Sequence, residues 1–281
     1  MEMKKYTTII SAQELYKNLD NPDFILIDCR FDLMQPAWGY ENYLKEHIPT
    51  AVFADLDKDL SGPKTPQTGR HPLPPENQFI KNCSTWGIDD QKQLVVYDTV
   101  SGAFAARLWW LLRSYGHEAV AVLNGGFSAW KNAQYPLSQG EESYIPSFFP
   151  GHFSNRYMAN TKEIESIIRN DSFVIIDARA RERYEGKIEP IDPVAGHIPG
   201  AKNLFHQFNL TDDGYWKTTE ELQKIYSPLV DDYPDDHLIV YCGSGVTSCF
   251  NLIGLAQLGI WNARLYVGSW SEWIRNPEHL K

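Results

Sequence analysis

The sequence predicts an α/β fold organised as two similar domains, each built on a mostly parallel sheet flanked by helices. Two observations support this prediction. The chain repeats itself at an offset of 143 to 150 residues, and in each copy short β-branched runs alternate with amphipathic helical stretches. With 281 residues, of which 43% are hydrophobic, the chain is long enough to fill the cores of two medium-sized domains.

The repeat begins with a helix and a strand in each half. Residues 24–30 (FILIDCR) recur as residues 173–179 (FVIIDAR). A helix-capping signature precedes each run, at Ser11 and at Asn160, with a glutamate three residues later. The remaining matches, in chain order, are an HIP tripeptide at His47 and His197, residues 94–98 (LVVYD) with 238–242 (LIVYC), and residues 123–130 (LNGGFSAW) with 266–273 (YVGSWSEW). We therefore expect the same order of elements in both halves.

The repeat also indicates where the domains end. Residues 136–157 are rich in proline, serine, glycine and aromatic residues and have neither helical nor strand periodicity, which is typical of a linker. We expect an N-terminal domain at residues 7–135, a linker at 136–157 and a C-terminal domain at 158–281. The aromatic residues of the linker predict that it packs against the domains.

Charge and composition exclude several classes of function. The formal net charge is −10 and there is no basic run, which argues against nucleic acid and anionic membranes as partners. The N-terminus lacks an apolar signal region and no stretch approaches a membrane span, so we expect a cytoplasmic protein. The four cysteines lack the paired spacing of a zinc site and are too few for a disulfide framework, which favours reduced thiols.

The segment from Cys242 to Ser248 is the strongest candidate for a functional site. It follows a buried-strand pattern at residues 238–241 and precedes a helical pattern at residues 250–256. A strand-to-helix turn at this edge of an α/β sheet is where ligands bind. We expect the glycines to permit positive φ, and we expect backbone and hydroxyl donors for an anion from the whole turn: Gly243, Ser244, Gly245, Val246, Thr247 and Ser248.

The position of Cys242 indicates a nucleophile. Converging N–H dipoles at the start of a helix favour the thiolate, which is the attacking form of cysteine. The alternative is a buried structural cysteine, which is common for this residue type, but the glycines around Ser244 favour the reactive role. Cys249, two helical turns further on, is expected to be a packed core residue.

With these motifs established, the chain resembles the tandem-rhodanese sulfurtransferases, which comprise thiosulfate and 3-mercaptopyruvate sulfurtransferases. The resemblance covers nearly the whole chain. It is carried by the Asp-x-Arg strand ends at Asp28 and Asp177, the HIP tripeptides, the tryptophan-containing segments at 123–130 and 266–273, and residues 242–248, the cysteine turn. It implies two tandem rhodanese-like domains, of which the second is catalytic. Asp98 stands at the cysteine position of the first domain, which is therefore expected to be silent.

The resemblance also implies a ping-pong reaction. The Cys242 thiolate would take sulfur from a small anionic donor, and the resulting persulfide would pass it to a thiol acceptor such as thioredoxin or a small thiol, or to cyanide. It implies no metal and no organic cofactor.

The cysteine turn and one arginine favour 3-mercaptopyruvate as the donor. The turn resembles that of the mercaptopyruvate enzymes, whereas thiosulfate enzymes place basic residues directly after the cysteine. Arg183 matches the arginine that binds the donor carboxylate in that family. The second family arginine is absent near Ile191, where Arg70, Lys187 or a backbone donor could take its place, and thiosulfate or another sulfane compound remains an alternative donor.

Proton transfer is expected to involve a relay. Asp57 and His71 match the region from which the mercaptopyruvate enzymes contribute an acid and a histidine, with Ser244 as their partner, to protonate the departing enolate. Apart from the resemblance, His71 is equally consistent with an exposed loop histidine, and Asp57 with a solvated surface charge. His47 and His197 occur in both halves, so a structural role is expected for them.

Two other functions are less consistent with the sequence. Cysteine phosphatases need Cys-x5-Arg to hold the phosphoryl oxygens, but Ser248 occupies the arginine position and the next arginine is Arg264. A sulfur-binding or regulatory module without turnover would fit the first domain alone, whereas the cysteine turn of the second argues for an enzyme.

Overall fold

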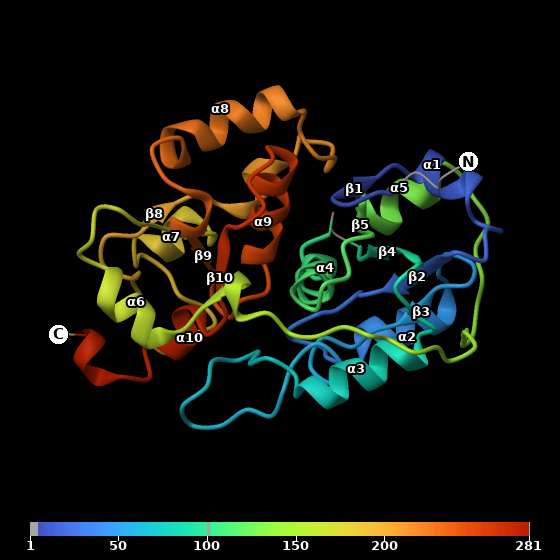
Figure 1. Ribbon diagram of the computed structural model, residues 1–281, viewed down its shortest axis with the longest axis horizontal. Helices are drawn as coiled ribbons and strands as arrows, with labels where there is room; N and C mark the ends of the chain where they lie inside the picture. The colour runs from blue at the N-terminus through green and yellow to red at the C-terminus, as the bar shows by residue number, and fades with distance from the viewer. Residues whose placement is uncertain (1–4, 100–101, 281) are drawn as a thin grey trace. The chain divides into compact units, whose positions relative to one another are not determined.

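A computed structural model describes residues 5–99 and 102–280, which form two compact units (Figure 1). The first contains the described residues up to 62 together with 74–154 and 212–216, and the second contains 63–73, 155–211 and 217–280. Each unit has a five-stranded parallel sheet with flanking helices, so the predicted α/β fold is confirmed. The predicted linker spans the division at residue 154. The two exchanged segments, 63–73 and 212–216, were not expected from the sequence.

The first unit has the strand order β1-β5-β4-β2-β3, with every pair parallel. Its central strand, β4, lies between β2 and β5. The strands are β1 (Ile9–Ile10), β2 (Phe24–Asp28), β3 (Val52–Phe53), β4 (Gln93–Tyr97) and β5 (Val120–Leu123), and the helices are α1 (Ala12–Lys17), α2 (Trp38–Lys45), α3 (Glu76–Thr85), α4 (Ala105–Ser114) and α5 (Gly126–Asn132).

The second unit repeats this arrangement with the order β6-β10-β9-β7-β8. Each strand takes the place of its counterpart, so β9 is central as β4 is in the first unit. The strands are β6 (Met158–Ala159), β7 (Val174–Asp177), β8 (Lys202–Asn203), β9 (Leu238–Tyr241) and β10 (Arg264–Tyr266); the helices are α6 (Thr161–Ile167), α7 (Arg181–Tyr184), α8 (Thr219–Val230), α9 (Ser248–Gln257) and α10 (Ser269–Trp273); and short 3-10 helices cover Asn155–Tyr157, His206–Asn209, Asp235–His237 and Pro277–Leu280.

The predicted capping signatures start the first helix of each unit. The Ser11 hydroxyl accepts the backbone N–H of Glu14 at 3.1 Å, and the Asn160 side chain accepts that of Glu163, also at 3.1 Å. Each bond satisfies one of the N–H groups that a helix start leaves without an intrahelical partner. α8 is the longest described helix, with 12 residues, and no described helix has the length and apolar character needed to cross a membrane.

The Asp-x-Arg motifs stabilise the carboxyl ends of β2 and β7. Asp28 pairs with Arg30 at 2.6 Å, and Asp177 pairs with Arg179 at 2.7 Å, with both pairs buried. The Arg30 guanidinium also donates to the carbonyl oxygen of Glu46, the residue before the HIP tripeptide, at 2.6 Å. Arg179 makes the equivalent bond to the carbonyl oxygen of Gly196 at 2.7 Å. These ionic pairs are satisfied by hydrogen bonds, as buried charges require, and they join each strand end to the HIP loop.

The HIP histidines have equivalent surroundings in both units. The Nδ1 of His47 donates to the carbonyl oxygen of Tyr43 at 2.8 Å, and that of His197 donates to the carbonyl oxygen of Tyr184 at 2.7 Å. The ring of His47 also stacks on the ring of Tyr43, and the ring of His197 stacks on that of Tyr184. The contacts agree with the predicted structural role.

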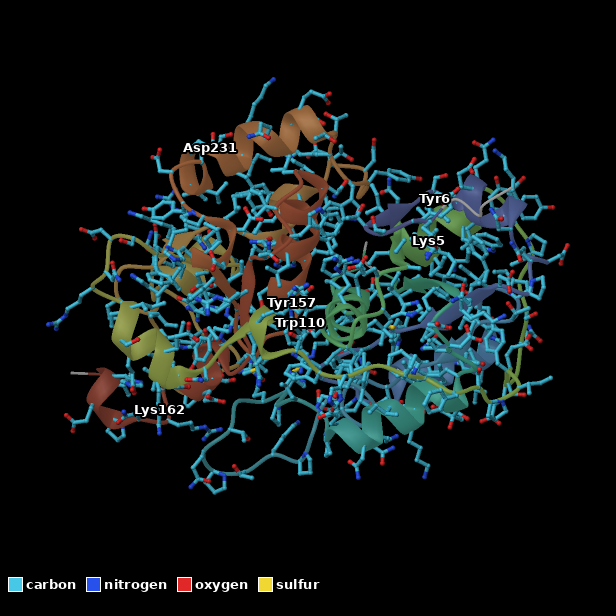
Figure 2. All side chains as sticks on the ribbon, in the orientation of Figure 1. Lys5, Tyr6, Trp110, Tyr157, Lys162 and Asp231 are labelled. Atoms are coloured by element: carbon cyan, nitrogen blue, oxygen red, sulfur yellow. The ribbon has the colours of Figure 1, made fainter. Side chains whose placement is uncertain are left out.

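The helix that follows the central strand is embedded in each unit. Every residue of α4 except Arg113 is buried, as is every residue of α9 except Gln257. Trp110 of α4, labelled in Figure 2, is 3% exposed. Because central strand and helix are both enclosed, the turn between them is held at both ends by packed structure.

In the first unit this turn is closed by the carboxylate of Asp98, which directly follows β4. Its oxygens accept the backbone N–H groups of Gly102 at 2.8 Å, Phe104 at 2.6 Å and Ala105 at 3.1 Å. Asp98 is 1% exposed. The start of α4 therefore has an anion supplied by its own chain, at the position that Cys242 occupies in the second unit.

We expect Asp98→Asn to destabilise the first unit by about 1–3 kcal/mol, because an amide replaces one acceptor oxygen with a donor that faces buried N–H groups. Urea denaturation of the full chain, followed for the transition of the first unit, measures the loss. Asp20→Asn, at an exposed site, is the matched control. Equal unfolding free energies for the two variants would contradict the role assigned to Asp98.

Candidate active site

The turn between β9 and α9 is held by hydrogen bonds from α10. The backbone N–H of Cys242 donates to the Ser269 hydroxyl at 3.1 Å. In return, the carbonyl oxygens of Cys242 and Gly243 accept the N–H groups of Trp270 at 3.0 Å and Ser271 at 2.9 Å. Three hydrogen bonds made by the backbone of Cys242 and Gly243 thus fix the position of Cys242.

The two glycines of the turn are needed for different reasons. Gly245 has a φ of +72°, and a Cβ there would lie 2.4 Å from the carbonyl oxygen of Val267. Gly243 does not have positive φ, which corrects the expectation that both glycines permit it. A Cβ on Gly243 would instead lie 2.6 Å from Nη2 of Arg70. Gly245 therefore supplies conformational freedom and Gly243 supplies room for a guanidinium.

The sulfur of Cys242 lies among hydrogen-bond donors. The residue is 2% exposed, and the Ser248 hydroxyl donates to Sγ at 3.4 Å. Burial alone would raise the pKa of this thiol. The hydroxyls of Ser248 and Thr247 and the backbone N–H groups of Ser244 and Ser248 oppose burial and hold the pKa below its ordinary value. The Cys242 turn therefore favours the thiolate.

Two of the other cysteines, Cys29 and Cys83, have the opposite property. Burial raises the pKa of Cys29 and Cys83 well above the ordinary value. Cys249 is fully buried, and its Sγ lies 3.4 Å from the carbonyl oxygen of Gly245. Its packing agrees with the core position expected for it. Val246, also predicted to contribute to the turn, is 3% exposed.

His71 lies beside the cysteine turn, in segment 63–73 of the second unit. Its Nδ1 is 2.8 Å from Oγ of Ser244, and the two residues are 3% and 6% exposed. The segment is attached by the Arg70 backbone N–H, which donates to the Ser271 hydroxyl at 3.0 Å. His71 is therefore a buried partner of the turn and not the exposed loop histidine that its sequence surroundings allow.

Asp57 belongs to the first unit. Its backbone N–H donates to Oδ1 of Asp55 at 2.9 Å in the turn after β3. A relay from Asp57 to His71 remains a prediction.

The side chain of Arg183, on α7, lies close to Gly243 in the cysteine turn. Its guanidinium makes two bonds to Glu189, at 2.7 and 3.0 Å, and lies 3.4 Å from Oδ2 of Asp192. Its Nη2 lies 3.5 Å from the point where a Cβ on Gly243 would stand. Burial would raise the pKa of Glu189, but the bonds from Arg183 and from nearby N–H groups hold it below the ordinary value, so the pair is ionic.

Sequence reasoning missed the residues that hold this site in place. Glu189 and Asp192 orient Arg183, Ser271 holds the Arg70 backbone, and Ser269 accepts the N–H of Cys242. Only the two serines lie in the repeat, where Ser269 matches Gly126 and Ser271 matches Ser128. Ser269 has a φ of +54° and Gly126 has a φ of +57°. A serine in this conformation costs about 1 kcal/mol or more, and its hydroxyl makes a bond that glycine would not.

Comparison with known proteins places this geometry in a family. A model of the rhodanese-like domain matches residues 11–133 and 160–276. A Pseudomonas aeruginosa protein named probable 3-mercaptopyruvate sulfurtransferase is 44% identical over 271 residues, covering 96% of this chain and 95% of its own. The Arabidopsis thaliana thiosulfate/3-mercaptopyruvate sulfurtransferase 1 is 30% identical, covering 96% of this chain and 76% of its own. The structure of 3-mercaptopyruvate sulfurtransferase from Leishmania major superposes with a TM-score of 0.84 at 33% identity, over 95% of this chain and 74% of that one.

We expect Gly245→Ala to cost about 3 kcal/mol or more, because a Cβ at this φ also meets the Val267 carbonyl. Gly259→Ala is the matched control, since Gly259 has a φ of +83° with nothing within 4 Å of a Cβ, and should cost only about 1 kcal/mol. Urea denaturation of both variants gives the difference. Equal losses would show that the Val267 contact is relaxed at no cost.

We expect Ser248→Ala to raise the pKa of the Cys242 thiol. The thiolate forms as pH rises through this pKa, so at a pH below the ordinary thiol value the variant should react more slowly with iodoacetamide. The pH dependence of alkylation measures the shift, with a Cys242→Ser background subtracted. The exposed Ser166→Ala should react as the unmodified protein does, and an unchanged midpoint in Ser248→Ala would exclude this hydroxyl as a stabiliser of the thiolate.

Proposed function

The chain belongs to the rhodanese-like sulfurtransferases, and from this premise we propose that it carries sulfur as a persulfide on Cys242, with 3-mercaptopyruvate favoured over thiosulfate as the donor. The observation that carries the proposal is the setting of the thiol. Cys242 is buried among hydroxyl and N–H donors that hold its pKa low, whereas burial raises the pKa of Cys29 and Cys83.

In the first half-reaction, the Cys242 thiolate attacks the sulfur of 3-mercaptopyruvate. A bond forms between the two sulfur atoms as the donor's carbon–sulfur bond breaks, and the electron pair of that bond remains on carbon as the enolate of pyruvate. The N–H and hydroxyl groups that favour the thiolate also stabilise the persulfide anion, since both place negative charge in the same turn.

The departing enolate needs a proton to become pyruvate. His71 and Ser244, whose Nδ1 and Oγ are 2.8 Å apart, form a hydrogen-bonded pair that can deliver one next to the cysteine. Asp57 is proposed as the acid that orients His71, as the family resemblance suggests.

In the second half-reaction, an acceptor thiolate attacks the outer sulfur of the persulfide. The bond between the two sulfur atoms breaks, the Cys242 thiolate is regenerated, and the acceptor leaves as a persulfide. Thioredoxin and small thiols are the proposed acceptors. Cyanide would leave as thiocyanate.

The charges around the turn support the choice of donor. Arg183 is already paired with Glu189 and approaches Asp192. Thiosulfate is a compact dianion and needs concentrated positive charge, whereas mercaptopyruvate carries one carboxylate at a distance from its sulfur. The Pseudomonas relative named for mercaptopyruvate, at 44% identity, supports the same choice.

We expect kcat/KM for 3-mercaptopyruvate to exceed that for thiosulfate at least tenfold with a common acceptor, or about 1.4 kcal/mol in transition-state binding. Mass spectrometry after donor alone should show one added sulfur atom on Cys242. Cys242→Ser is the blank, and the buried Cys249→Ser should retain the persulfide. A tenfold preference for thiosulfate would reverse the donor assignment, and turnover by Cys242→Ser would exclude the mechanism.

A further inference from the structure

The first residues of α10 hold the cysteine turn, and the same short helix also holds segment 63–73, which is far from it in the sequence. The Ser271 hydroxyl accepts the Arg70 backbone N–H at 3.0 Å. One carboxylate oxygen of Glu272 accepts the backbone N–H of Gly69 at 3.3 Å. Two consecutive side chains of α10 therefore fix two consecutive backbone groups of a segment that belongs to the same unit.

Gly69 allows this segment to approach α10 closely. A Cβ on Gly69 would lie 2.5 Å from the carbonyl oxygen of Gly268 and 2.9 Å from Oγ of Ser271. Gly268 is itself crowded, because a Cβ there would lie 2.3 Å from Cδ of Glu272. The carboxylate of Glu272 thus folds back over the backbone of Gly268, and the two glycines leave room for the contact.

The Glu272 carboxylate is fixed through both of its oxygens. The Thr161 hydroxyl, at the start of α6, donates to Oε1 at 2.5 Å, and Oγ1 of Thr161 lies 2.8 Å from the hydroxyl of Tyr266 at the end of β10. Oε2 accepts the Gly69 N–H. Hydrogen bonds to a carboxylate are roughly twice as strong as those between neutral groups. Glu272 therefore ties segment 63–73 to the framework of the second unit.

The first unit provides an internal comparison, because α5 is the counterpart of α10. The Phe127 N–H donates to the carbonyl oxygen of Asp98 at 2.9 Å, so α5 holds its turn as α10 does. The position of Glu272, however, is occupied by Ala129 in the first unit. The carboxylate is thus not needed to build the strand, turn and helix, and it is found in the unit that contains the cysteine.

The fixed backbone leads directly to His71. Only Arg70 separates His71 from Gly69, and neighbouring Cα atoms are about 3.8 Å apart. His71 is 3% exposed, and its Nδ1 lies 2.8 Å from Oγ of Ser244. A proton donor must lie within hydrogen-bond reach of the group that it serves, at about 2.6 to 3.2 Å. A shift of about 1 Å at Gly69 would therefore carry the ring out of reach.

We propose that Glu272 is a positioning residue for proton transfer: it holds the backbone of Gly69, and this contact sets His71 against Ser244 so that the departing enolate is protonated. The inference rests on the proposed function and deepens it, since it assigns a residue to one chemical step of that reaction. The attack of the Cys242 thiolate on the donor sulfur needs no proton and is expected to be independent of Glu272.

The first test separates proton transfer from nucleophilic attack by changing the donor. 3-Mercaptopyruvate releases an enolate that must take up a proton, whereas methanethiosulfonate releases methanesulfinate, a stable anion that needs none. In single turnovers without acceptor at saturating donor, Glu272→Ala should slow pyruvate release about tenfold or more and sulfinate release by less than about threefold. Glu272→Gln should recover part of the loss, because its amide oxygen can still accept the Gly69 N–H.

Two further variants serve as matched comparisons. Gly69→Ala disturbs the same contact from the other segment, since its Cβ would meet the Gly268 carbonyl, and should show the same selective loss of pyruvate release. Glu220→Ala, which removes an exposed glutamate of α8, should match the unmodified protein with both donors. The pH dependence of Cys242 alkylation by iodoacetamide should be unchanged in Glu272→Ala, because the donors around the sulfur are retained.

The second test needs no turnover. His71 is buried in the unmodified protein and should react slowly with diethyl pyrocarbonate, as measured by mass spectrometry of the peptide that contains it. Glu272→Ala should label His71 about threefold faster or more, because release of the segment exposes the ring. Glu220→Ala should label it at the unmodified rate.

The two tests separate failure of this inference from failure of the proposed function. An unmodified protein that releases neither pyruvate nor sulfinate would overturn the proposed function, and the labelling of His71 would still decide whether Glu272 holds the segment. Equal labelling of His71 in Glu272→Ala and the unmodified protein would overturn the positioning role. Equal slowing of both donors, or a shifted pH dependence of alkylation, would also overturn it, since either result would place the effect of Glu272 on the nucleophile.

Discussion

The structure of both units depends on the need to satisfy the backbone N–H groups of the turn between the central strand and its buried helix. These donors converge and cannot be left unpaired inside a packed protein. The first unit meets them with the Asp98 carboxylate. In the second unit the hydroxyl of Ser248 and N–H groups of the turn are directed at the sulfur of Cys242. One backbone arrangement thus accepts either a permanent carboxylate or a reactive sulfur anion.

This difference explains how a duplicated fold can hold one reactive centre. Asp98 occupies its turn permanently, because the carboxylate belongs to the chain and cannot leave. Cys242 places a sulfur among equivalent donors, and under the proposed function that sulfur would gain and lose a second sulfur atom. The elements around the two turns are otherwise closely matched, including the buried pairs Asp28–Arg30 and Asp177–Arg179. The specialisation is concentrated in the turn and in the residues that contact it.

The surroundings of the turn further separate the units. Segment 63–73 packs in the second unit and brings Arg70 and His71 to the cysteine turn. Arg70 then shares Asp192 with Arg183. One short segment thereby brings both an arginine and a histidine to the cysteine turn.

The sequence by itself determined the repeat, the α/β class, the helix caps at Ser11 and Asn160, and the place of Cys242 at the end of a buried strand. These features follow from local patterns of hydrophobicity, capping and turn residues, which are visible along the chain. Tertiary structure decided the rest. It showed that Gly243 makes room for Arg70 and has no positive φ, and that His71 is buried against Ser244. It also revealed that Asp192 joins two arginines separated by more than a hundred residues. Such contacts depend on packing between distant segments, which no local pattern encodes.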